Sequence, residues 1–337
     1  MKLRTLLSLI GSGRLPVLLP MMRLVQSYHR LAFLAAGLAS GILRRLAGGK
    51  HTLDELTAAL NADPSMRDGL AAWLQVGTAL GELRCEADGY SLHGKLARQL
   101  ADPANEAAAA FVEEVAFLHN LIITQTPQRL GPARPFSLND QDDRMIAQSS
   151  RLAEPFICEA IDQVVPRVGA LRLFEIGCGT AAYIRYAASR NHELTALGLD
   201  LQPGAAALAT QNVKSWNLAA RVTIETGNVL QRDPQPTFDV ATLHQNIYYF
   251  PLERRVDVLR HVGGFLKPGG RLLLTTFCQG GGVGGEVLNL WGAMTEGCGR
   301  LPTAEEMVAQ MQQAGFVDVR SRSLIPGEGF YSFVGVL

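Results

Sequence analysis

The chain has 337 residues, with 31 Lys and Arg residues against 31 Asp and Glu residues, so its formal net charge is zero. This length has room for two domains and a sizeable core. The balanced charge gives no global field that attracts nucleic acid or an anionic membrane, so we expect neither partner. The five cysteines are odd in number and scattered, without a Cys-x-x-Cys pair. They indicate reduced thiols in a cytoplasmic protein, with no disulfide framework and no metal site.

The N-terminal sequence MKLRTLLSLI resembles a signal peptide only briefly. Gly11, Gly13 and Arg14 interrupt its apolar run, and no small-residue cleavage site follows. We therefore predict a helix there and no cleaved leader.

Residues 16–47 are rich in Leu, Ala and Met and carry few charges. The apolar stretch from Leu31 to Leu43 is broken by glycines and closed by two arginines, so it is too short for a bilayer span. Helices with this much apolar surface are not stable when exposed. We therefore expect them to pack against a second subunit.

A helix, a second helix and a hairpin are predicted in the next part of the chain. Thr52 and Glu55 have the spacing of a capping box, which opens a helix to about residue 62. A second helix runs from 63 to about 80, and residues 83–92 have the pattern of a hairpin with an Asp-Gly turn. This order is typical of a winged-helix domain.

A winged helix raises DNA binding as a rival function. The second helix would enter the groove, but between Ser65 and Leu80 its only charged residues are Arg67 and Asp68. Phosphate contacts need more basic residues than this. A dimerisation module is therefore the favoured interpretation.

Residues 104–128 are predicted to be helical, and His119 is the polar residue on an otherwise apolar face. A core histidine is the favoured interpretation and a substrate contact is the alternative. Residues 131–142 contain several prolines and glycines and few hydrophobic side chains, which is typical of a linker. The predicted domains are therefore 1–130 and 143–337.

Strands and helices alternate in the second domain. The predicted elements are a helix at 143–164, a strand at 171–176, a helix from 180, a strand at 194–199, a helix at 204–217, strands at 221–226 and 238–243, a helix at 252–266 and a strand at 271–277. Short apolar strands separated by helices predict an α/β fold with a parallel sheet covered on both faces. Ligands of such sheets bind at the carboxyl ends of the strands.

A glycine turn, Gly177-Cys178-Gly179, joins the first of these strands to its helix. Its glycines let backbone N–H groups approach a ligand, and the next strand ends on Asp200, whose carboxylate suits ribose hydroxyls. Together these features predict a nucleoside site. The acid before the turn, Glu175, would repel a pyrophosphate but could hold an ammonium group. An adenosine that carries an amino acid therefore fits better than a dinucleotide.

The sequence blocks of this domain resemble the Rossmann-like methyltransferases that use S-adenosylmethionine. The resemblance begins at Phe174-Glu175-Ile176-Gly177-Cys178-Gly179-Thr180 and Gly198-Leu199-Asp200, and it continues through 227–229, 238–241 and 265–274. The third glycine of the family's loop is Ala181 here. The resemblance implies a class I small-molecule O-methyltransferase, with a mostly parallel seven-stranded sheet preceded by a mainly α winged-helix domain that builds a dimer.

The same resemblance implies which residues contact the cofactor: Met145, Ser149, Glu175, Gly177, Gly179, Asp200, Leu201, Asn228, Val229 and His244. Met145 and Ser149 lie one turn apart on one helix face. Asn228 stands where the family usually has an acid facing the adenine amino group, and an amide oxygen can accept the same hydrogen bond. Val229 would pack on the adenine ring.

At the tip of the fourth strand, many relatives of this type carry a His-Asp-Trp triplet whose histidine removes the acceptor's proton. In this chain the three positions are Tyr248, Tyr249 and Phe250. The family's acidic partner of that histidine falls on Leu301. The expected general base is therefore missing.

Three alternatives remain for the proton. Tyr248 could orient or deprotonate the acceptor, although an unperturbed phenol has a pKa near ~10. His244 has a more suitable intrinsic pKa but stands where the family has a cofactor contact. The third alternative is an in-line displacement that proximity drives without a protein base, with Tyr248 positioning the acceptor. We favour the third.

The predicted acceptor pocket comprises His119, Asn246, Tyr249, Gln279, Trp291 and Met294. Residues 279–286 contain so many glycines that we predict a mobile loop, which is a candidate lid.

The expected function is transfer of a methyl group from S-adenosylmethionine to a small apolar or aromatic acceptor of secondary metabolism, by a cytoplasmic homodimer. O-methylation is favoured, and N- or C-methylation stays open. One alternative is an enzyme of this fold that keeps the cofactor for non-methylating chemistry. A winged-helix transcriptional regulator comes last.

Overall fold

The computed structural model describes residues 11, 13, 15–86 and 89–337. The chain divides into two compact units. The N-terminal unit comprises the residues up to 120 together with 144–149, and the C-terminal unit comprises 121–143 and 150–337. The division therefore falls earlier than the predicted linker at 131–142. Part of that segment is built into the C-terminal unit, where Phe136 is buried and its N–H donates to the Met294 carbonyl at 2.7 Å.

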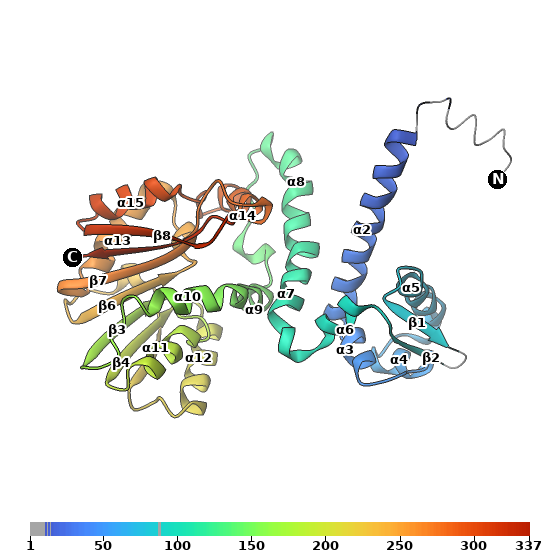
Figure 1. Cartoon of the computed structure of the whole chain (residues 1–337), viewed down its shortest axis with the longest axis horizontal. Coiled ribbons are helices and arrows are strands. Elements are labelled where there is room, and N and C mark those ends of the chain that lie inside the picture. Colours follow the sequence, from blue (N-terminus) through green and yellow to red (C-terminus); the bar gives the residue numbers. More distant parts are fainter. Residues whose placement is uncertain (1–10, 12, 14, 87–88) are drawn as a thin grey trace. The chain divides into compact units, whose positions relative to one another are not determined.

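The N-terminal unit is mainly helical (Figure 1). Its elements are α2 (Leu15–Ala39), α3 (Ile42–Ala47), α4 (Leu53–Ala59), η1 (Pro64–Met66), α5 (Arg67–Ala79), β1 (Leu83–Glu86), β2 (Gly89–Leu92), α6 (Lys95–Ala101), η2 (Pro103–Asn105), α7 (Glu106–Glu114), the π-helical turn η3 (Val115–His119) and most of α9 (Asp143–Ser149). Its core includes Leu34, Leu43 and Leu74, with Phe33 stacked on Trp73 at 4.4 Å between ring centroids.

The predicted order of two helices and a hairpin is confirmed. Thr52 and Glu55 form both hydrogen bonds of the capping box at the start of α4. Strands β1 and β2 pair antiparallel, from Leu83 opposite Leu92 to Glu86 opposite Gly89. The predicted turn falls on residues 87 and 88, which lie outside the described part of the chain.

One helical stretch among the described residues, Pro103–Leu130, is long and apolar enough to cross a bilayer, with a mean hydropathy of 1.4. Core helices of soluble proteins share this length and apolar composition.

The C-terminal unit is built around one seven-stranded sheet (Figure 1). Its strands are β3 (Leu171–Ile176), β4 (Leu194–Asp200), β5 (Val222–Thr226), β6 (Phe238–His244), β7 (Leu266–Phe277), β8 (Val317–Ile325) and β9 (Phe330–Val336). They lie in the order β5-β4-β3-β6-β7-β9-β8. The first five in this order pair parallel, and β9 pairs antiparallel with both β7 and β8.

Helices and short helical turns connect these strands. They are α8 (Asn120–Leu130), η4 (Leu138–Asp140), η5 (Ser150–Ala153), α10 (Glu154–Ile161), α11 (Ala182–Arg190), α12 (Pro203–Ser215), η6 (Val229–Gln231), η7 (Ile247–Tyr249), η8 (Leu252–Arg254), α13 (Arg255–Gly263), α14 (Val283–Met294) and α15 (Ala304–Gln313).

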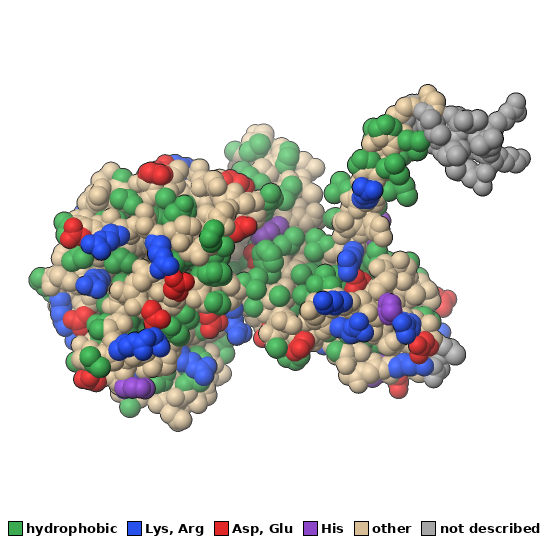
Figure 2. Space-filling view, in the orientation of Figure 1, with side chains coloured by type: hydrophobic (Ala, Val, Ile, Leu, Met, Phe, Trp, Pro, Cys, Tyr) green, Lys and Arg blue, Asp and Glu red, His purple; other side chains and the backbone are tan. Residues whose placement is uncertain are grey.

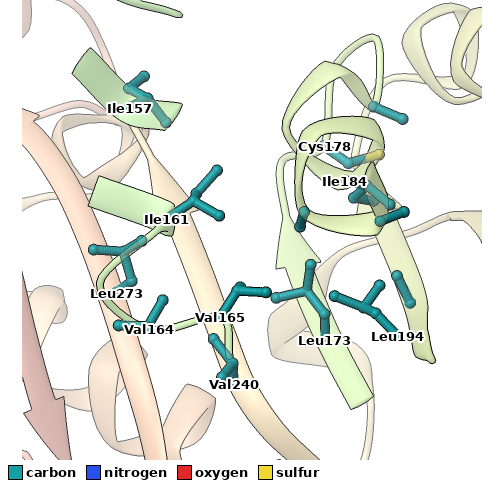
Figure 3. Packing of buried hydrophobic residues seen from close by; sticks show 14 of the residues in the cluster. Ile157, Ile161, Val164, Val165, Leu173, Cys178, Ile184, Leu194, Val240 and Leu273 are labelled. Atoms are coloured by element: carbon teal, nitrogen blue, oxygen red, sulfur yellow. The ribbon is translucent and has the colours of Figure 1, made fainter. Parts of the chain in front are cut away.

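Alternation along each strand gives the sheet two buried faces. Leu173, Val240 and Leu273 point to one face and pack with α10 and α11, as Figure 3 shows. Their neighbours in the sequence, such as Phe174 and Leu272, point to the other face and pack with α13 and α15. The predicted parallel sheet with helices on both faces is therefore confirmed.

Two predicted helices have different bounds in the structure. The helix expected at 143–164 is split into α9, η5 and α10, because Pro155 in the first turn of α10 lacks the N–H that a continuous helix needs. The helix expected at 252–266 ends at Gly263, since β7 already begins at Leu266.

The glycine-rich segment after β7 packs closely against the turn between β8 and β9. A Cβ atom at Gly281 would lie 2.5 Å from the Glu328 carbonyl oxygen, and one at Gly329 would lie 2.7 Å from the Cys278 carbonyl oxygen. The Cys278 N–H also donates to the Gly329 carbonyl at 2.7 Å. At these positions the glycines serve close backbone packing.

Candidate active site

The turn between β3 and α11 has the left-handed backbone that its glycines allow. The φ angles are 69° at Gly177, 52° at Gly179 and 61° at Ala181. The N–H groups of Gly177 and Cys178 both donate to the Leu199 carbonyl, at 2.8 and 3.1 Å, which joins the turn to β4. Ala181 adopts a conformation that costs a non-glycine residue roughly 1–2 kcal/mol. The tight turn is therefore retained without the family's third glycine.

Asp200 holds this turn from the end of the neighbouring strand. One of its carboxylate oxygens accepts from the Gly179 N–H at 2.8 Å, and the other accepts from the Gln202 N–H at 3.0 Å. The next residue, Leu201, is 60% exposed. The predicted ribose-binding acid thus lies directly beside the glycine turn.

The two glycines of the turn differ in their surroundings. A Cβ atom at Gly177 would lie 2.7 Å from Nδ2 of Asn246, whereas a Cβ atom at Gly179 would meet nothing within 4 Å.

We expect Gly177→Ala to lower the free energy of unfolding by roughly 3 kcal/mol, because it adds a clash to the backbone strain. The matched control Gly179→Ala has the strain alone and should lose about 1 kcal/mol. Urea denaturation of both variants measures the difference. Equal losses would show that the Asn246 contact is unimportant.

At the end of β5, Asn228 caps the short turn η6. Its side-chain oxygen accepts from the Leu230 N–H at 3.0 Å. The oxygen that we expected to face adenine is thus already engaged, although a second lone pair and the amide hydrogens remain available. Val229 is buried beside it.

Glu175 is the most unusual group of the site. It is 1% exposed, and neither of its carboxylate oxygens has a hydrogen-bond partner. Burial, followed by the nearby charge of Asp200, raises the pKa of Glu175 well above its ordinary value. The N–H of Ile184 faces the carboxylate without reaching hydrogen-bond geometry, and it offsets only part of this rise. A buried carboxylate without partners is costly, and a cationic ligand would remove much of the cost.

His244 lies at the end of β6, on the same face of the sheet as Glu175. Its Nδ1 lies 3.0 Å from the Thr275 hydroxyl, and its ring packs against that of Tyr183 in a T-shaped arrangement, with the ring centroids 4.9 Å apart. Burial lowers the pKa of His244 to about 3. The ring is therefore neutral at physiological pH, and its Nε2 has no partner.

The tip after β6 carries an aromatic cluster. Tyr248 and Tyr249 have ring centroids 5.2 Å apart, and Trp291 of α14 meets both rings edge-on, at 6.0 and 5.4 Å. Tyr248 and Trp291 are buried. The structure therefore brings two predicted pocket residues, Tyr249 and Trp291, together with the candidate catalytic residue Tyr248.

Other predicted pocket residues have structural partners. The Asn246 amide donates to the Ile176 carbonyl at 2.6 Å, and its oxygen is buried without a partner. The Gln279 amide donates to the Leu301 carbonyl at 2.6 Å. The Met294 carbonyl accepts from Phe136, and its side chain is partly buried.

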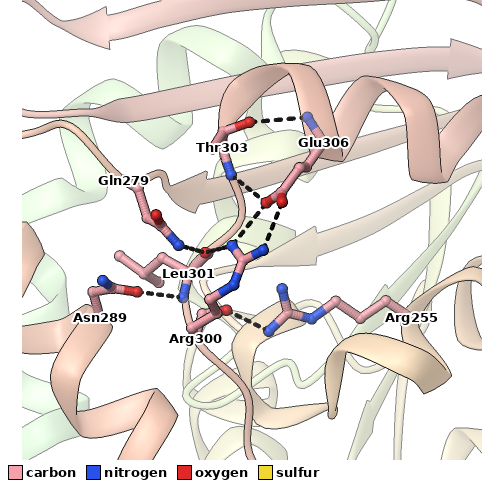
Figure 4. A network of polar contacts seen from close by, with 7 residues as sticks. All are labelled: Arg255, Gln279, Asn289, Arg300, Leu301, Thr303 and Glu306. Atoms are coloured by element: carbon pink, nitrogen blue, oxygen red, sulfur yellow. Dashed lines mark hydrogen bonds and ion pairs between the residues drawn. The ribbon is translucent and has the colours of Figure 1, made fainter.

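A polar network joins Arg255, Arg300 and Glu306 at the segment before α15 (Figure 4). The same network reaches the turn that carries the aromatic cluster. The fully buried Arg255 donates from Nε to the Phe250 carbonyl at 3.0 Å and from Nη2 to the Arg300 carbonyl at 2.7 Å. Arg300 in turn forms two hydrogen bonds to the carboxylate of Glu306, at 2.6 and 2.8 Å. Between them, the Gly299 N–H donates to the Tyr248 carbonyl at 2.9 Å.

Three predicted residues belong to the N-terminal unit. His119 ends the π-helical turn, and its Nε2 lies 3.2 Å from a carboxylate oxygen of Glu114. Such turns recur at functional sites. Met145 and Ser149 are buried, and the Ser149 hydroxyl donates to the Ile146 carbonyl at 3.1 Å.

Three side chains at this site were not predicted: Tyr183, Thr275 and Arg255. Thr275 lies opposite His244 in the pairing of β6 with β7, so the order of the strands was the missing information. Tyr183 lies in the first turn of α11, which places its ring over the strand tips beside His244. Arg255 gives no sequence signal, because arginines are usually exposed. Among the described residues, no group of three or more His, Cys, Asp or Glu side chains could hold a metal ion.

Comparison with known proteins agrees with this geometry. Residues 174–272 match the family described as Methyltransferase domain. Demethylspheroidene O-methyltransferase of Rhodobacter capsulatus is 27% identical over 245 residues, which cover 69% of this chain and 56% of that protein. The chain therefore spans about half the length of this curated relative.

Two solved structures share the fold. An O-methyltransferase family protein of Burkholderia thailandensis has a TM-score of 0.73 at 22% identity, covering 95% of this chain and 97% of that one. Human N-acetylserotonin methyltransferase in complex with SAM has a TM-score of 0.72 at 14% identity, with coverage of 95% and 97%. Residues 174–272 therefore match a methyltransferase domain, and the fold of the chain is similar to that of O-methyltransferases.

Proposed function

We propose that the protein transfers a methyl group from S-adenosylmethionine to a small, largely apolar or aromatic acceptor, with oxygen as the favoured target atom. The observation that carries this proposal is the buried Glu175 carboxylate beside the glycine turn, whose two oxygens have no partner. An amino-acid ammonium group would give this carboxylate the partner that it lacks.

The side chains around the turn fit the rest of the cofactor. Asp200 has lone pairs left for the ribose hydroxyls, and Asn228 and Val229 stand at the next strand end for the adenine ring. When bound, S-adenosylmethionine supplies an electrophilic methyl group on a sulfonium centre. In this proposal the chain itself binds, orients and shields the reacting groups.

The acceptor would be held by the aromatic cluster of Tyr248, Tyr249 and Trp291. Such rings offer a flat apolar wall with two phenol groups, which suits an aromatic or apolar molecule carrying a hydroxyl. The name of the curated relative, an O-methyltransferase, favours oxygen as the target.

A protein base is not part of the proposal. With a pKa of about 3, His244 is too weak a base to take a proton from an acceptor hydroxyl near neutral pH. Proximity and alignment then supply much of the rate, as expected for an acceptor that is already nucleophilic.

The variant Tyr248→Phe tests whether the Tyr248 phenol acts as the general base. We expect turnover to stay within about threefold of the unmodified protein, because a general base contributes about 100-fold or more when it acts. Tyr249→Phe is the matched control on the same turn. A loss of about 100-fold in the Tyr248 variant alone would assign the base to that phenol.

Two experiments test the function itself. Calorimetry with S-adenosylmethionine and S-adenosylhomocysteine should show binding of both, and failure of the folded protein to bind either would refute the cofactor assignment. Incubation with methyl-labelled cofactor and a metabolite extract should then label a small molecule. Binding without any labelled product would favour the alternative, an enzyme that retains its cofactor for other chemistry.

We also propose that the protein is a cytoplasmic homodimer. Phe111 of α7 and Phe117 of η3 are 40% and 48% exposed, which suits a subunit contact. The five free cysteines suit a reducing compartment. Sedimentation velocity over a range of concentrations tests the dimer, and a monomer throughout would contradict it.

A further inference from the structure

Glu175 has surroundings unlike those of an exposed acidic side chain. Figure 2 shows acidic and basic side chains scattered over the surface of the C-terminal unit, where water stabilises their charges. Glu175 instead is 1% exposed, and neither of its carboxylate oxygens has a hydrogen-bond partner. An ionised carboxylate in such a place is costly, and a proton on the carboxyl removes the charge.

The neighbouring strands offer Glu175 no positive charge. In the sheet it lies between Gly198 of β4 and Thr242 of β6, and neither of these carries a charge. Burial raises the pKa of Glu175, and the negative charge of Asp200, at the end of β4, raises it further. The Thr242 hydroxyl is itself buried without a partner. These groups of the sheet therefore do not compensate an ionised Glu175.

The elements that cover this face of the sheet do not supply a cation either. Burial raises the pKa of Cys178 in the turn and of Tyr183 in α11, so both are uncharged near neutral pH. Burial likewise raises the pKa of Cys158 in α10 to about 11. Arg151 of η5 lies 3.6 Å from Glu154 of α10 in an ion pair, and both charges act on Tyr183. In these surroundings the carboxyl is most stable with its proton.

The groups beside Glu175 are poor acceptors for that proton. His244 lies two residues beyond Thr242 on the same face of the sheet. Burial lowers the pKa of His244 to about 3, so its ring does not hold a proton near neutral pH. Both carboxylate oxygens of Asp200 already accept from backbone N–H groups, and a proton there would weaken those bonds. A proton that leaves Glu175 therefore passes to the solvent.

We propose that Glu175 holds its proton in the ligand-free protein and releases it to the solvent when the ammonium group of the cofactor binds. The inference rests on the proposed function, in which that ammonium group is the partner of the carboxylate. Glu175 then recognises the charge on the amino-acid end of the ligand, and a nucleoside without that end leaves the proton in place. The affinity for the cofactor rises with pH until the carboxyl of the ligand-free protein is itself ionised.

Calorimetry of the full chain in buffers of low and high ionisation enthalpy measures the released proton. At about pH 6 we expect about one proton to be released for each S-adenosylhomocysteine bound. 5′-Methylthioadenosine lacks the amino-acid end, and its binding should release none. Between about pH 5 and pH 6 the affinity for S-adenosylhomocysteine should rise about tenfold, whereas that for 5′-methylthioadenosine should stay constant.

The variant Glu175→Gln separates this carboxyl from other groups that titrate. Its amide has no proton to lose, so the release on binding of S-adenosylhomocysteine should fall to about zero, and the affinity should no longer change with pH. Glu253 is exposed in the same unit, and Glu253→Gln is the matched control. It should release as much as the unmodified protein. The comparison of the two ligands uses the unmodified protein and is independent of the folding of either variant.

Three results would overturn the proposal. The first is binding of S-adenosylhomocysteine without proton release at about pH 6, the second is equal release with 5′-methylthioadenosine, and the third is undiminished release in folded Glu175→Gln. In each case S-adenosylhomocysteine still binds, so the proposed function stands. Failure of the folded protein to bind S-adenosylhomocysteine would instead refute the proposed function, and this proposal with it.

Discussion

Replacing Glu175 by Gln is expected to weaken S-adenosylmethionine binding by roughly 10- to 100-fold, because a charge-assisted hydrogen bond contributes about 1.5–3 kcal/mol. The same variant should make the ligand-free protein more stable. Glu175 is buried without a partner, so its charge costs free energy until a cation binds. Calorimetry measures the affinity, and urea denaturation measures the stability.

The pH dependence follows from the direction of the pKa shift. The pKa of Glu175 is raised in the folded state, so the folded protein holds that proton more tightly than the unfolded chain does. This stabilisation is complete below the ordinary value of 4.5 and is lost as the pH rises through the folded pKa. In Glu175→Gln that part of the pH dependence should vanish.

Glu253 is exposed, and Glu253→Gln is the matched control in the same unit. It should change neither the affinity for S-adenosylmethionine nor the free energy of unfolding. An affinity unchanged by Glu175→Gln would remove this residue from the cofactor site. A less stable variant would show that the carboxylate has a stabilising partner in solution.

Replacing Arg255 by Met is expected to lower the free energy of unfolding by roughly 3 kcal/mol, since two buried carbonyls lose their donors. Those carbonyls belong to Phe250 and Arg300, on the two segments that the guanidinium joins. An opposing effect exists: Nη1 of Arg255 has no partner, and burial lowers the pKa of this group to about 10. We expect the two lost hydrogen bonds to outweigh that cost.

The neighbouring Arg254→Met is the control, because Arg254 is exposed and should change stability by less than about 0.5 kcal/mol. A more stable Arg255→Met protein would mean that desolvation of the charge dominates. Since Arg255 holds the Tyr248 turn, its loss should raise the KM for the acceptor and leave cofactor affinity unchanged. An equal weakening of acceptor binding and of cofactor binding would indicate general unfolding of the unit.

The sheet was predictable because its strands are short apolar runs between helical segments. Strand β3 has the predicted bounds, and the glycine turn and Asp200 lie together as parallel pairing requires. The contact between His244 and Thr275 depends on which strand lies beside β6, and periodicity does not give strand order. The low pKa of His244 likewise depends on burial by residues distant in the sequence.

In the N-terminal region, the net charge of the whole chain and its apolar composition do not predict which side chains are exposed. The net charge of zero does not report that the first 53 residues contain no acidic residue, because a sum is blind to where the charges lie along the chain. The exposure of Val17 and Leu24 depends on where the packing of α2 begins, and only the structure shows that it begins near Phe33.

The hydrogen bond from the Gly179 N–H to Asp200 lies between two parts of the protein itself and needs no ligand atom. The turn therefore has little backbone freedom left to lose when a nucleoside enters, and the entropic cost of ordering it has already been met during folding. Association should accordingly be fast and similar among variants that keep this bond. Differences in affinity among them should appear as differences in residence time.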